Sequence, residues 1–360
     1  MVNVTKAFLP DKEEFLKYID GIWDRCHLTN HGPLVLELEA RLKKYLGVKH
    51  FFFLNNGTIA LQIAIKALDL RGKIITTPFS YVATTSSIVW ENCTPVFADI
   101  KTDNLTIDPA SIEKLITPDT TAIMATHVYG IPGDVNRIEN IARKYGLRVI
   151  YDAAHAFGVE FDGRGLLNYG DISSLSFHAT KLFHTIEGGG LATNDDELAH
   201  RINYMRNFGH DGPEKFHGVG INGKASEFNA AMGLTNLPHI EAIIADRKRT
   251  CDIYDRLIKA ANLCIKRPTI PAGTVYNYAY YPTLFESEKA LLTVKDALSK
   301  DEIFPRRYFY PSLNTLHYLT EKQGCPVSED VSTRALCLPL YYGMEQELAE
   351  KIIAIIQKAL

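Results

Sequence analysis

The feature that most constrains the fold of this chain is an alternation of short apolar runs with helix-length segments. His50–Leu54, Lys73–Thr77 and Thr121–His127 are typical of buried strands, and Thr58–Leu70 is typical of a helix between two of them. Strands that alternate with helices pair in parallel through helical crossovers. We therefore expect an α/β fold with a mostly parallel sheet and helices on both of its faces.

The length and the later part of the chain indicate a second domain. A chain of 360 residues is long for one domain. Residues 238–260 are typical of a long connecting helix, and beyond them short strands mix with helices. We expect a large domain over residues 1–237, whose N-terminal segment could pack against the other domain. A smaller α/β C-terminal domain is expected over residues 238–360.

Charge and cysteine usage exclude several classes of protein. The net charge of -3 and the pI of about 6.5 favour neither nucleic acid nor an anionic membrane as a partner. No apolar stretch approaches the roughly 20 residues that span a bilayer. The N-terminal residues lack the pattern of a secretory signal. The six cysteines are scattered, without metal-binding spacing. We expect a cytoplasmic protein without a metal site.

The stretch Ser173–Thr193, SSLSFHATKLFHTIEGGGLAT, places a lysine in an unusual setting. A short apolar strand leads into a polar crossing that presents Lys181, and the glycine run Gly188–Gly190 follows. Glycine allows the backbone to approach a ligand closely or to adopt positive φ. An exposed lysine beside a tight turn is the ordinary alternative, because most lysines lie at the surface.

The stretch Leu147–Gly158, LRVIYDAAHAFG, gives this lysine a possible partner. It predicts a buried parallel strand that ends at Asp152, and ligands bind beyond the carboxyl ends of such strands. The same aspartate could instead cap a following helix. Pyridoxal phosphate needs a lysine for its Schiff base and an aspartate beside its pyridine nitrogen. Lys181 and Asp152 together therefore indicate this cofactor.

Three further segments allow both a structural and a ligand-binding interpretation. Asn55–Thr58 precedes a helix, so it is either a plain cap or an anion site at the helix start. Tyr81 is either a core aromatic or a cover for a flat ring. Residues 306–314, RRYFYPSLN, form either a packed loop or a binding loop for an anionic or sugar ligand. Residues 209–223 predict a long loop, and their GVGING lacks the dinucleotide fingerprint.

The order of motifs along the chain resembles one family. This chain contains, in order, NGT, TPFSYVAT, DAAHAFG, SFHATK, EGGG and KASEFNAA. This order resembles that of the DegT/DnrJ/EryC1/StrS nucleotide-sugar aminotransferases. The likeness extends over nearly the whole chain. It implies a fold-type-I enzyme that depends on pyridoxal phosphate, and a homodimer whose active sites lie at the subunit interface.

The resemblance also implies roles for residues around the cofactor ring. Lys181 matches the Schiff-base lysine, and Asp152 matches the partner of the pyridine nitrogen. Tyr81 matches the aromatic residue that stacks on the ring. His155 stands where many relatives carry Gln, near the phenolic oxygen of the cofactor. Some relatives replace the lysine by His and act as dehydratases, and Lys181 argues against that reaction here.

A second group of residues matches the phosphate contacts of the family. These contacts are implied for Gly57, Thr58 and Ser176 of one subunit. Asn229 matches a residue that reaches the phosphate of the neighbouring subunit.

The implied reaction is a two-stage transamination from L-glutamate to a nucleotide-linked keto-sugar. TNHGP at residues 29–33 and RRYFYP at residues 306–311 resemble members that act on dTDP-4-keto-6-deoxyhexoses. We therefore expect amination at C4, for a cell-surface polysaccharide such as O-antigen or for a glycoside. The residues expected to contact the sugar nucleotide are Arg306, Arg307, Tyr308 and Tyr310, with at most one of the two arginines on phosphate.

Several alternatives stay open from the sequence. A 3-aminotransferase or an enzyme for UDP-linked sugars would share the same core motifs. A nicotinamide-dependent dehydratase or reductase would need GxGxxG after its first strand, which is absent. A non-catalytic regulatory relative of the same fold should lack the lysine or the aspartate, and both are present.

Overall fold

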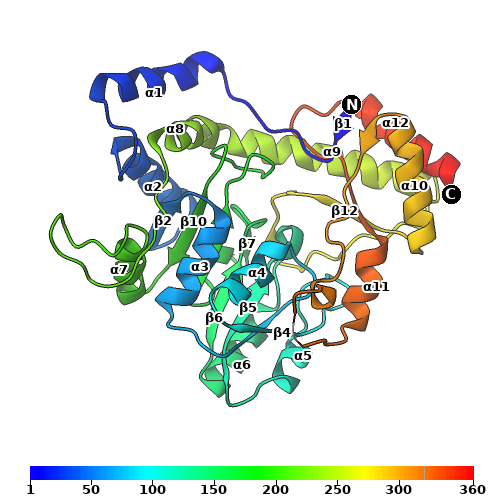
Figure 1. Cartoon of the computed structure of the whole chain (residues 1–360). Coiled ribbons are helices and arrows are strands. Elements are labelled where there is room, and N and C mark those ends of the chain that lie inside the picture. The colour runs from blue at the N-terminus through cyan, green and yellow to red at the C-terminus, as the bar shows by residue number, and fades with distance from the viewer. Residues whose placement is uncertain (320) are drawn as a thin grey trace.

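The computed structural model describes residues 1–319 and 321–360, and a seven-stranded sheet lies at its centre (Figure 1). In spatial order its strands are β2 (His50–Leu54), β10 (Gly189–Thr193), β9 (Ile172–Ser176), β6 (Arg148–Asp152), β5 (Thr120–Thr126), β3 (Lys73–Thr76) and β4 (Thr94–Phe97). Neighbours from β9 to β4 pair in parallel, whereas β10 is antiparallel to both of its neighbours. The expected mostly parallel sheet is confirmed.

Helices cover both faces of this sheet, as the alternation predicted. One face packs against α3 (Gly57–Ala67), α4 (Val82–Trp90) and α7 (Asp196–Met205). The core on the other face includes residues of α2 (Pro33–Leu46), α5 (Pro109–Lys114), α6 (Val135–Tyr145) and α8 (Glu227–Asn236). Outside this layer, α1 (Lys12–Arg25) packs against α8.

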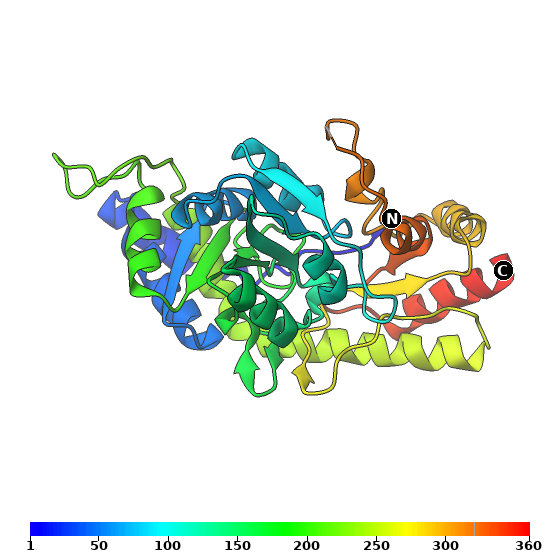
Figure 2. The ribbon, with the colours of Figure 1, turned by 90° about the horizontal axis from the view of Figure 1, so that it is seen from below.

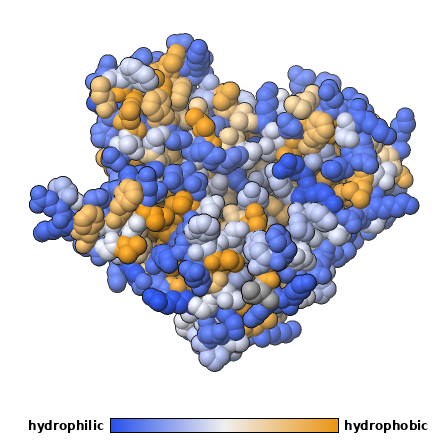
Figure 3. Space-filling model, in the orientation of Figure 1, coloured by the Kyte–Doolittle hydropathy of each residue, from blue (hydrophilic) through white to orange (hydrophobic). Residues whose placement is uncertain are grey.

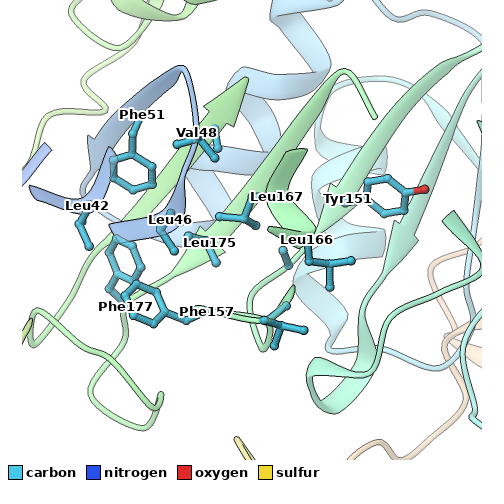
Figure 4. Packing of buried hydrophobic residues seen from close by; sticks show 14 of the residues in the cluster. Leu42, Leu46, Val48, Phe51, Tyr151, Phe157, Leu166, Leu167, Leu175 and Phe177 are labelled. Atoms are coloured by element: carbon cyan, nitrogen blue, oxygen red, sulfur yellow. The ribbon is translucent and has the colours of Figure 1, made fainter. Parts of the chain in front are cut away.

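The two cores arise from the alternation of side chains along each strand. In β2, Phe51 and Phe53 join the core on the side of α2, whereas Phe52 and Leu54 join the core on the side of α3. Successive side chains of a strand point to opposite faces, so a continuous apolar run can serve both cores. Figure 4 shows Phe51 and Leu42 of α2 in the first of these cores.

The C-terminal part of the chain builds a core of its own. This core is built by α9 (Ile240–Ala260), α10 (Glu288–Lys300), α12 (Gln346–Ala359) and the antiparallel strands β12 (Tyr281–Leu284) and β14 (Ala335–Leu338). The remaining helix, α11 (Pro326–Arg334), places Val331 in a different cluster, with Phe79 and Tyr129. Figure 2 shows the long helix α9 in yellow-green, with α12 in red beside its C-terminal half. The proposed boundary between residues 237 and 238 stays a prediction.

Short strands connect distant parts of the chain. β1 (Val2–Asn3) pairs in parallel with β13 (Ile303–Phe304), so the N-terminal segment lies on the C-terminal part. β11 (Thr274–Val275), β7 (Glu160–Phe161) and β8 (Arg164–Gly165) form a separate small sheet. Within the described ranges, no helix combines the length and the apolar character needed to cross a bilayer.

The glycine run has a structural use that differs from the expected one. Gly188, Gly189 and Gly190 have no positive φ in the described backbone. A Cβ added at Gly189 would lie 2.4 Å from the carbonyl carbon of Asn56. The glycines therefore let β10 approach the start of α3, and the close neighbour is protein rather than ligand.

Candidate active site

A cavity of about 320 Å³ lies at the carboxyl ends of β5, β6 and β9. This is where open α/β sheets bind ligands. The predicted site residues that line it are Gly57, Thr58, Tyr81, Asp152, His155, Ser176, Lys181, Arg306 and Tyr308. Of the predicted site residues, all of which the structure describes, Asn229, Arg307 and Tyr310 lie outside this lining.

Asp152 ends β6 as a buried carboxylate. Thr84 donates to its Oδ2 at 2.7 Å and the amide of Ala154 donates to its Oδ1 at 3.1 Å, while Ser80 and Thr126 extend the hydroxyl chain behind Thr84. Burial raises the pKa of the Asp152 carboxyl, and the hydrogen bond from Thr84 opposes the rise. Turns rather than a helix follow, so the capping alternative is wrong.

Lys181 lies in the loop between β9 and β10, half-buried in the cavity lining. Its Nζ donates to the hydroxyl of Tyr280 at 3.4 Å. Burial lowers the pKa of the Lys181 amine, although the charge of Asp152 opposes the change. The exposed-lysine alternative is therefore wrong. A lysine with a lowered pKa is neutral over a wider pH range and is a better nucleophile.

His155 is held as a neutral ring in the wall of the cavity. Its Nδ1 accepts a hydrogen bond from the amide of Tyr129 at 3.1 Å, which leaves the ring proton on Nε2. Its ring stacks on that of Phe309 with centroids 5.6 Å apart. Burial holds the pKa of His155 well below its usual range, and the nearby charge of Lys181 adds to the effect. His155 can therefore donate a hydrogen bond to a ligand without carrying charge.

The start of α3 offers free backbone donors. Asn56 caps the helix, because its side chain accepts from the amide of Ile59 at 2.8 Å. Within the described chain, the amides of Gly57 and Thr58 have no hydrogen-bond acceptor. The cap thus falls on Asn56 and leaves the next two amides to face the cavity beside Ser176. Free amides at a helix start favour an anion.

Tyr81 lies between β3 and α4, at the strand-to-helix connection expected from the sequence. It occupies the N-cap position of α4, its side chain makes no capping bond, and it is 59% exposed. The core-aromatic alternative is wrong, and the ring is available to cover a flat ligand.

The basic-aromatic loop at residues 306–314 divides its side chains between packing and cavity. Arg306, Tyr308 and Phe309 all line the cavity, and Phe309 is also buried against the core. Arg307 turns away: it pairs with Glu288 at 2.6 Å, donates to the carbonyl of Thr333 at 2.9 Å and lies over the ring of Tyr310. The loop is therefore both packed and ligand-facing, and the two adjacent arginines point differently.

Asn229 supports the lysine loop of its own chain. Its Nδ2 donates to the carbonyls of Thr185 and Glu187, at 2.8 and 2.9 Å, while its Oδ1 accepts from Ser226. Both amide protons are therefore used within the chain. Contact with the phosphate of a neighbouring subunit stays a prediction.

Sequence reasoning missed two residues of the site. Thr84 orients Asp152, and its signal was a polar pair, Ser80 and Thr84, spaced by four residues around a helix start. Tyr280 lines the cavity from the C-terminal part of the chain. Its surroundings, YNYAYY, gave no sign of which tyrosine would reach the site.

These residues fit pyridoxal phosphate. Asp152 is a buried carboxylate that, among the described residues, forms no salt bridge, and a protonated pyridine nitrogen would supply the missing cation. Lys181 supplies an amine, and α3 and Ser176 supply donors for a phosphate.

The profile of the DegT/DnrJ/EryC1/StrS aminotransferase family matches residues 10–357. The chain belongs to this family. It is similar to dTDP-4-amino-4,6-dideoxy-D-glucose transaminase of Shigella dysenteriae, with 42% identity over 99% of this chain and 98% of that protein. The Escherichia coli protein of the same name is 39% identical over 98% of this chain and 96% of that protein.

Solved structures agree with the family. The structure of DesI in the presence of its TDP-sugar product has a TM-score of 0.94 and 30% identity, and covers 99% of this chain and 92% of that one. The protein is therefore a pyridoxal-phosphate-dependent nucleotide-sugar aminotransferase of fold type I, which uses a nucleotide sugar and an amino donor. The nicotinamide-dependent and regulatory alternatives are not favoured.

Proposed function

We propose that this enzyme transfers the amino group of L-glutamate to C4 of dTDP-4-keto-6-deoxyglucose, giving dTDP-4-amino-4,6-dideoxyglucose. The observation that carries the proposal is the full-length similarity to the two transaminases named for this product. The family membership and the arrangement of Lys181 and Asp152 support the reaction type.

We assign roles in the reaction to the residues of the cavity. When bound, pyridoxal phosphate supplies an electron sink for the charge that develops at the reacting carbon. Lys181 holds the cofactor and moves the proton at the α-carbon of the amino donor. Asp152 keeps the ring nitrogen protonated. His155 and Tyr81 orient the ring. The phosphate is held by Gly57, Thr58 and Ser176.

Arg306 is the arginine that we assign to the nucleotide diphosphate. It lines the same cavity as Lys181, and its guanidinium lies 5.7 Å from the ring centroid of Tyr308. Guanidinium groups match phosphate geometry well. Arg307 is already engaged by Glu288 and Thr333, so we assign it to packing.

Product analysis tests the substrate assignment. Incubation of the enzyme with glutamate and dTDP-4-keto-6-deoxyglucose should give a 4-amino-4,6-dideoxy sugar nucleotide, identified by mass spectrometry and NMR. Efficient amination of a 3-keto isomer alone would instead assign the enzyme to the 3-aminotransferases. Amination of UDP-linked sugars alone would reject the nucleotide and keep the reaction type.

The assignment of Arg306 to the nucleotide diphosphate is tested with one variant and a matched control, Arg307→Gln. Arg306→Gln should raise the KM for the sugar nucleotide by about 10- to 100-fold, which corresponds to the roughly 1.5–3 kcal/mol of a charged hydrogen bond. The KM for glutamate should change far less. Arg307→Gln should lower thermal stability with little effect on either KM. If the two variants exchanged these effects, the assignment of Arg306 would be wrong.

We also propose that the enzyme is a homodimer with shared active sites. Large apolar side chains lie exposed on the single chain, among them Trp23 and Trp90, which are 65% and 77% exposed. Figure 3 shows apolar side chains gathered at the surface over α1. Exposed apolar patches of this kind are typical of association surfaces.

Mixing two inactive variants tests whether Asn229 acts across the dimer. Asn229→Asp places a carboxylate against either a phosphate or the carbonyls of Thr185 and Glu187, and both are unfavourable. If Asn229 reaches the neighbouring site, a heterodimer with Lys181→Ala contains one intact site and regains activity. If Asn229 acts only on its own chain, both sites stay defective and the verified heterodimer remains inactive.

A further inference from the structure

The segment Tyr276–Tyr280, which we call the strap, is held by buried hydrogen bonds and ends at Tyr280 in the cavity lining. The hydroxyl of Tyr276 donates to the carbonyl of Tyr129 at 2.8 Å. Nδ2 of Asn277 donates to the carbonyl of His155 at 2.9 Å. The guanidinium of Arg247 donates to the carbonyl of Ala279 at 3.1 Å. These bonds hold the strap against α9 and against the segments that follow β5 and β6.

The strap places the side chain of Tyr280 next to Lys181. The hydroxyl of Tyr280 lies 3.4 Å from Nζ of Lys181 and accepts its hydrogen bond. The ring of Tyr280 packs edge-on against His155, with centroids 4.9 Å apart, and against Tyr308, with centroids 5.6 Å apart. Tyr280 itself is 6% exposed. Its hydroxyl therefore has a fixed position next to a flexible amine.

We propose that Tyr280 is a positioning residue for Lys181, and that its hydroxyl holds the amino group in the orientation from which the amine moves a proton at the substrate's α-carbon. This inference rests on the transamination proposed above. A lysine amine ends a long flexible side chain, and a fixed acceptor removes part of that freedom before reaction. When the amine donates to the hydroxyl oxygen, its lone pair is left for the proton of the substrate.

The surroundings keep this hydrogen bond intact over a wide pH range. Burial raises the pKa of the Tyr280 hydroxyl, so it stays neutral and does not form a competing charge beside the lysine. The titratable groups that face Lys181 from the other elements are Asp152, Tyr308, Tyr81 and His155.

The test compares Tyr280→Phe with the wild-type holoenzyme in the half-reaction with glutamate alone. The variant should react about 10- to 100-fold more slowly in a single turnover, because a misplaced catalytic group costs rate at this scale. The half-saturating concentration of glutamate should stay nearly constant. The kinetic isotope effect with α-deuterated glutamate should rise, because proton transfer becomes the slow step. An unchanged rate and isotope effect would overturn the proposal.

Tyr276→Phe is the matched control, because it removes another buried hydroxyl from the same strap. It should lower thermal stability and leave the isotope effect unchanged. If both variants slowed the half-reaction equally, with the same isotope effect, the role of the strap would be structural and the proposal would be wrong. Glutamate alone is used, so failure of the sugar assignment would not affect this result.

A readout that does not depend on activity uses the full chain freed of cofactor. Acetic anhydride labelling of Lys181, followed by mass spectrometry, gives the pH at which its amine deprotonates. Tyr280→Phe should shift that midpoint down by about one pH unit, because the lost acceptor stabilised the ammonium form. No shift would overturn the proposal. If Tyr280→Phe does not fold, 3-fluorotyrosine at this position keeps the shape, and an unchanged midpoint would again overturn it.

Discussion

Lys181→Ala should lower transaminase turnover by at least about 10⁴-fold, the upper range for loss of a general acid–base group. Lys181 is the lysine that lines the cavity of Asp152 and His155, and burial lowers the pKa of its amine. No other side chain in the cavity lining combines an amine with this position. Steady-state assays measure the loss. Borohydride treatment followed by peptide mapping should attach the cofactor to Lys181 in the wild-type enzyme and not in the variant.

Lys49→Ala is the matched control for this substitution. Lys49 is a surface lysine that pairs with Asp196 at 2.7 Å, and it lies outside the cavity lining, at the opposite end of β2 from Gly57 and Thr58. Its removal should leave turnover within about twofold of the wild-type value, since exposed ion pairs contribute little. Wild-type turnover in Lys181→Ala, or borohydride attachment to another lysine, would show that Lys181 is not the anchor.

The architecture could be predicted because the sheet is buried on both faces. Runs such as Phe51–Leu54 are apolar throughout and serve two cores at once, so they stand out in the sequence. The antiparallel place of β10 could not be predicted, because a short GGLAT segment carries no sign of its partner strands. The close approach of Gly189 to the backbone of Asn56 could not be predicted either, because the two residues are distant along the chain.

A site residue could be predicted where its own segment shows both its place in the fold and its chemical role. Asp152 ends a buried strand, and Lys181 precedes the glycine run, so each could be located from its own segment. Arg306 and Arg307 could not be told apart, because adjacent side chains are directed by tertiary contacts such as that with Glu288. Tyr280 was missed for the same reason, since only the fold brings it to Lys181.

Asp152→Asn should lower the rate of the glutamate half-reaction by about 100- to 1000-fold, the range for loss of one preorganised electrostatic partner. The substitution keeps the shape of the side chain, and the hydroxyl of Thr84 can rotate to accept from the new amide. What is lost is the negative charge that keeps the ring nitrogen protonated. Single-turnover kinetics with glutamate measure the effect apart from sugar binding.

The pH dependence of cofactor affinity gives this prediction a second, independent measurement. In the cofactor-free protein, burial raises the pKa of Asp152, so its charge is present above that pKa and is lost as the pH falls through it. Wild-type affinity should therefore weaken toward acid pH, and Asp152→Asn should lack this dependence. Thr84→Val removes a hydrogen bond that stabilises the carboxylate, so the weakening should begin at a higher pH. An Asp152→Asn variant with the wild-type half-reaction rate would instead show that the buried charge is not needed for proton transfer.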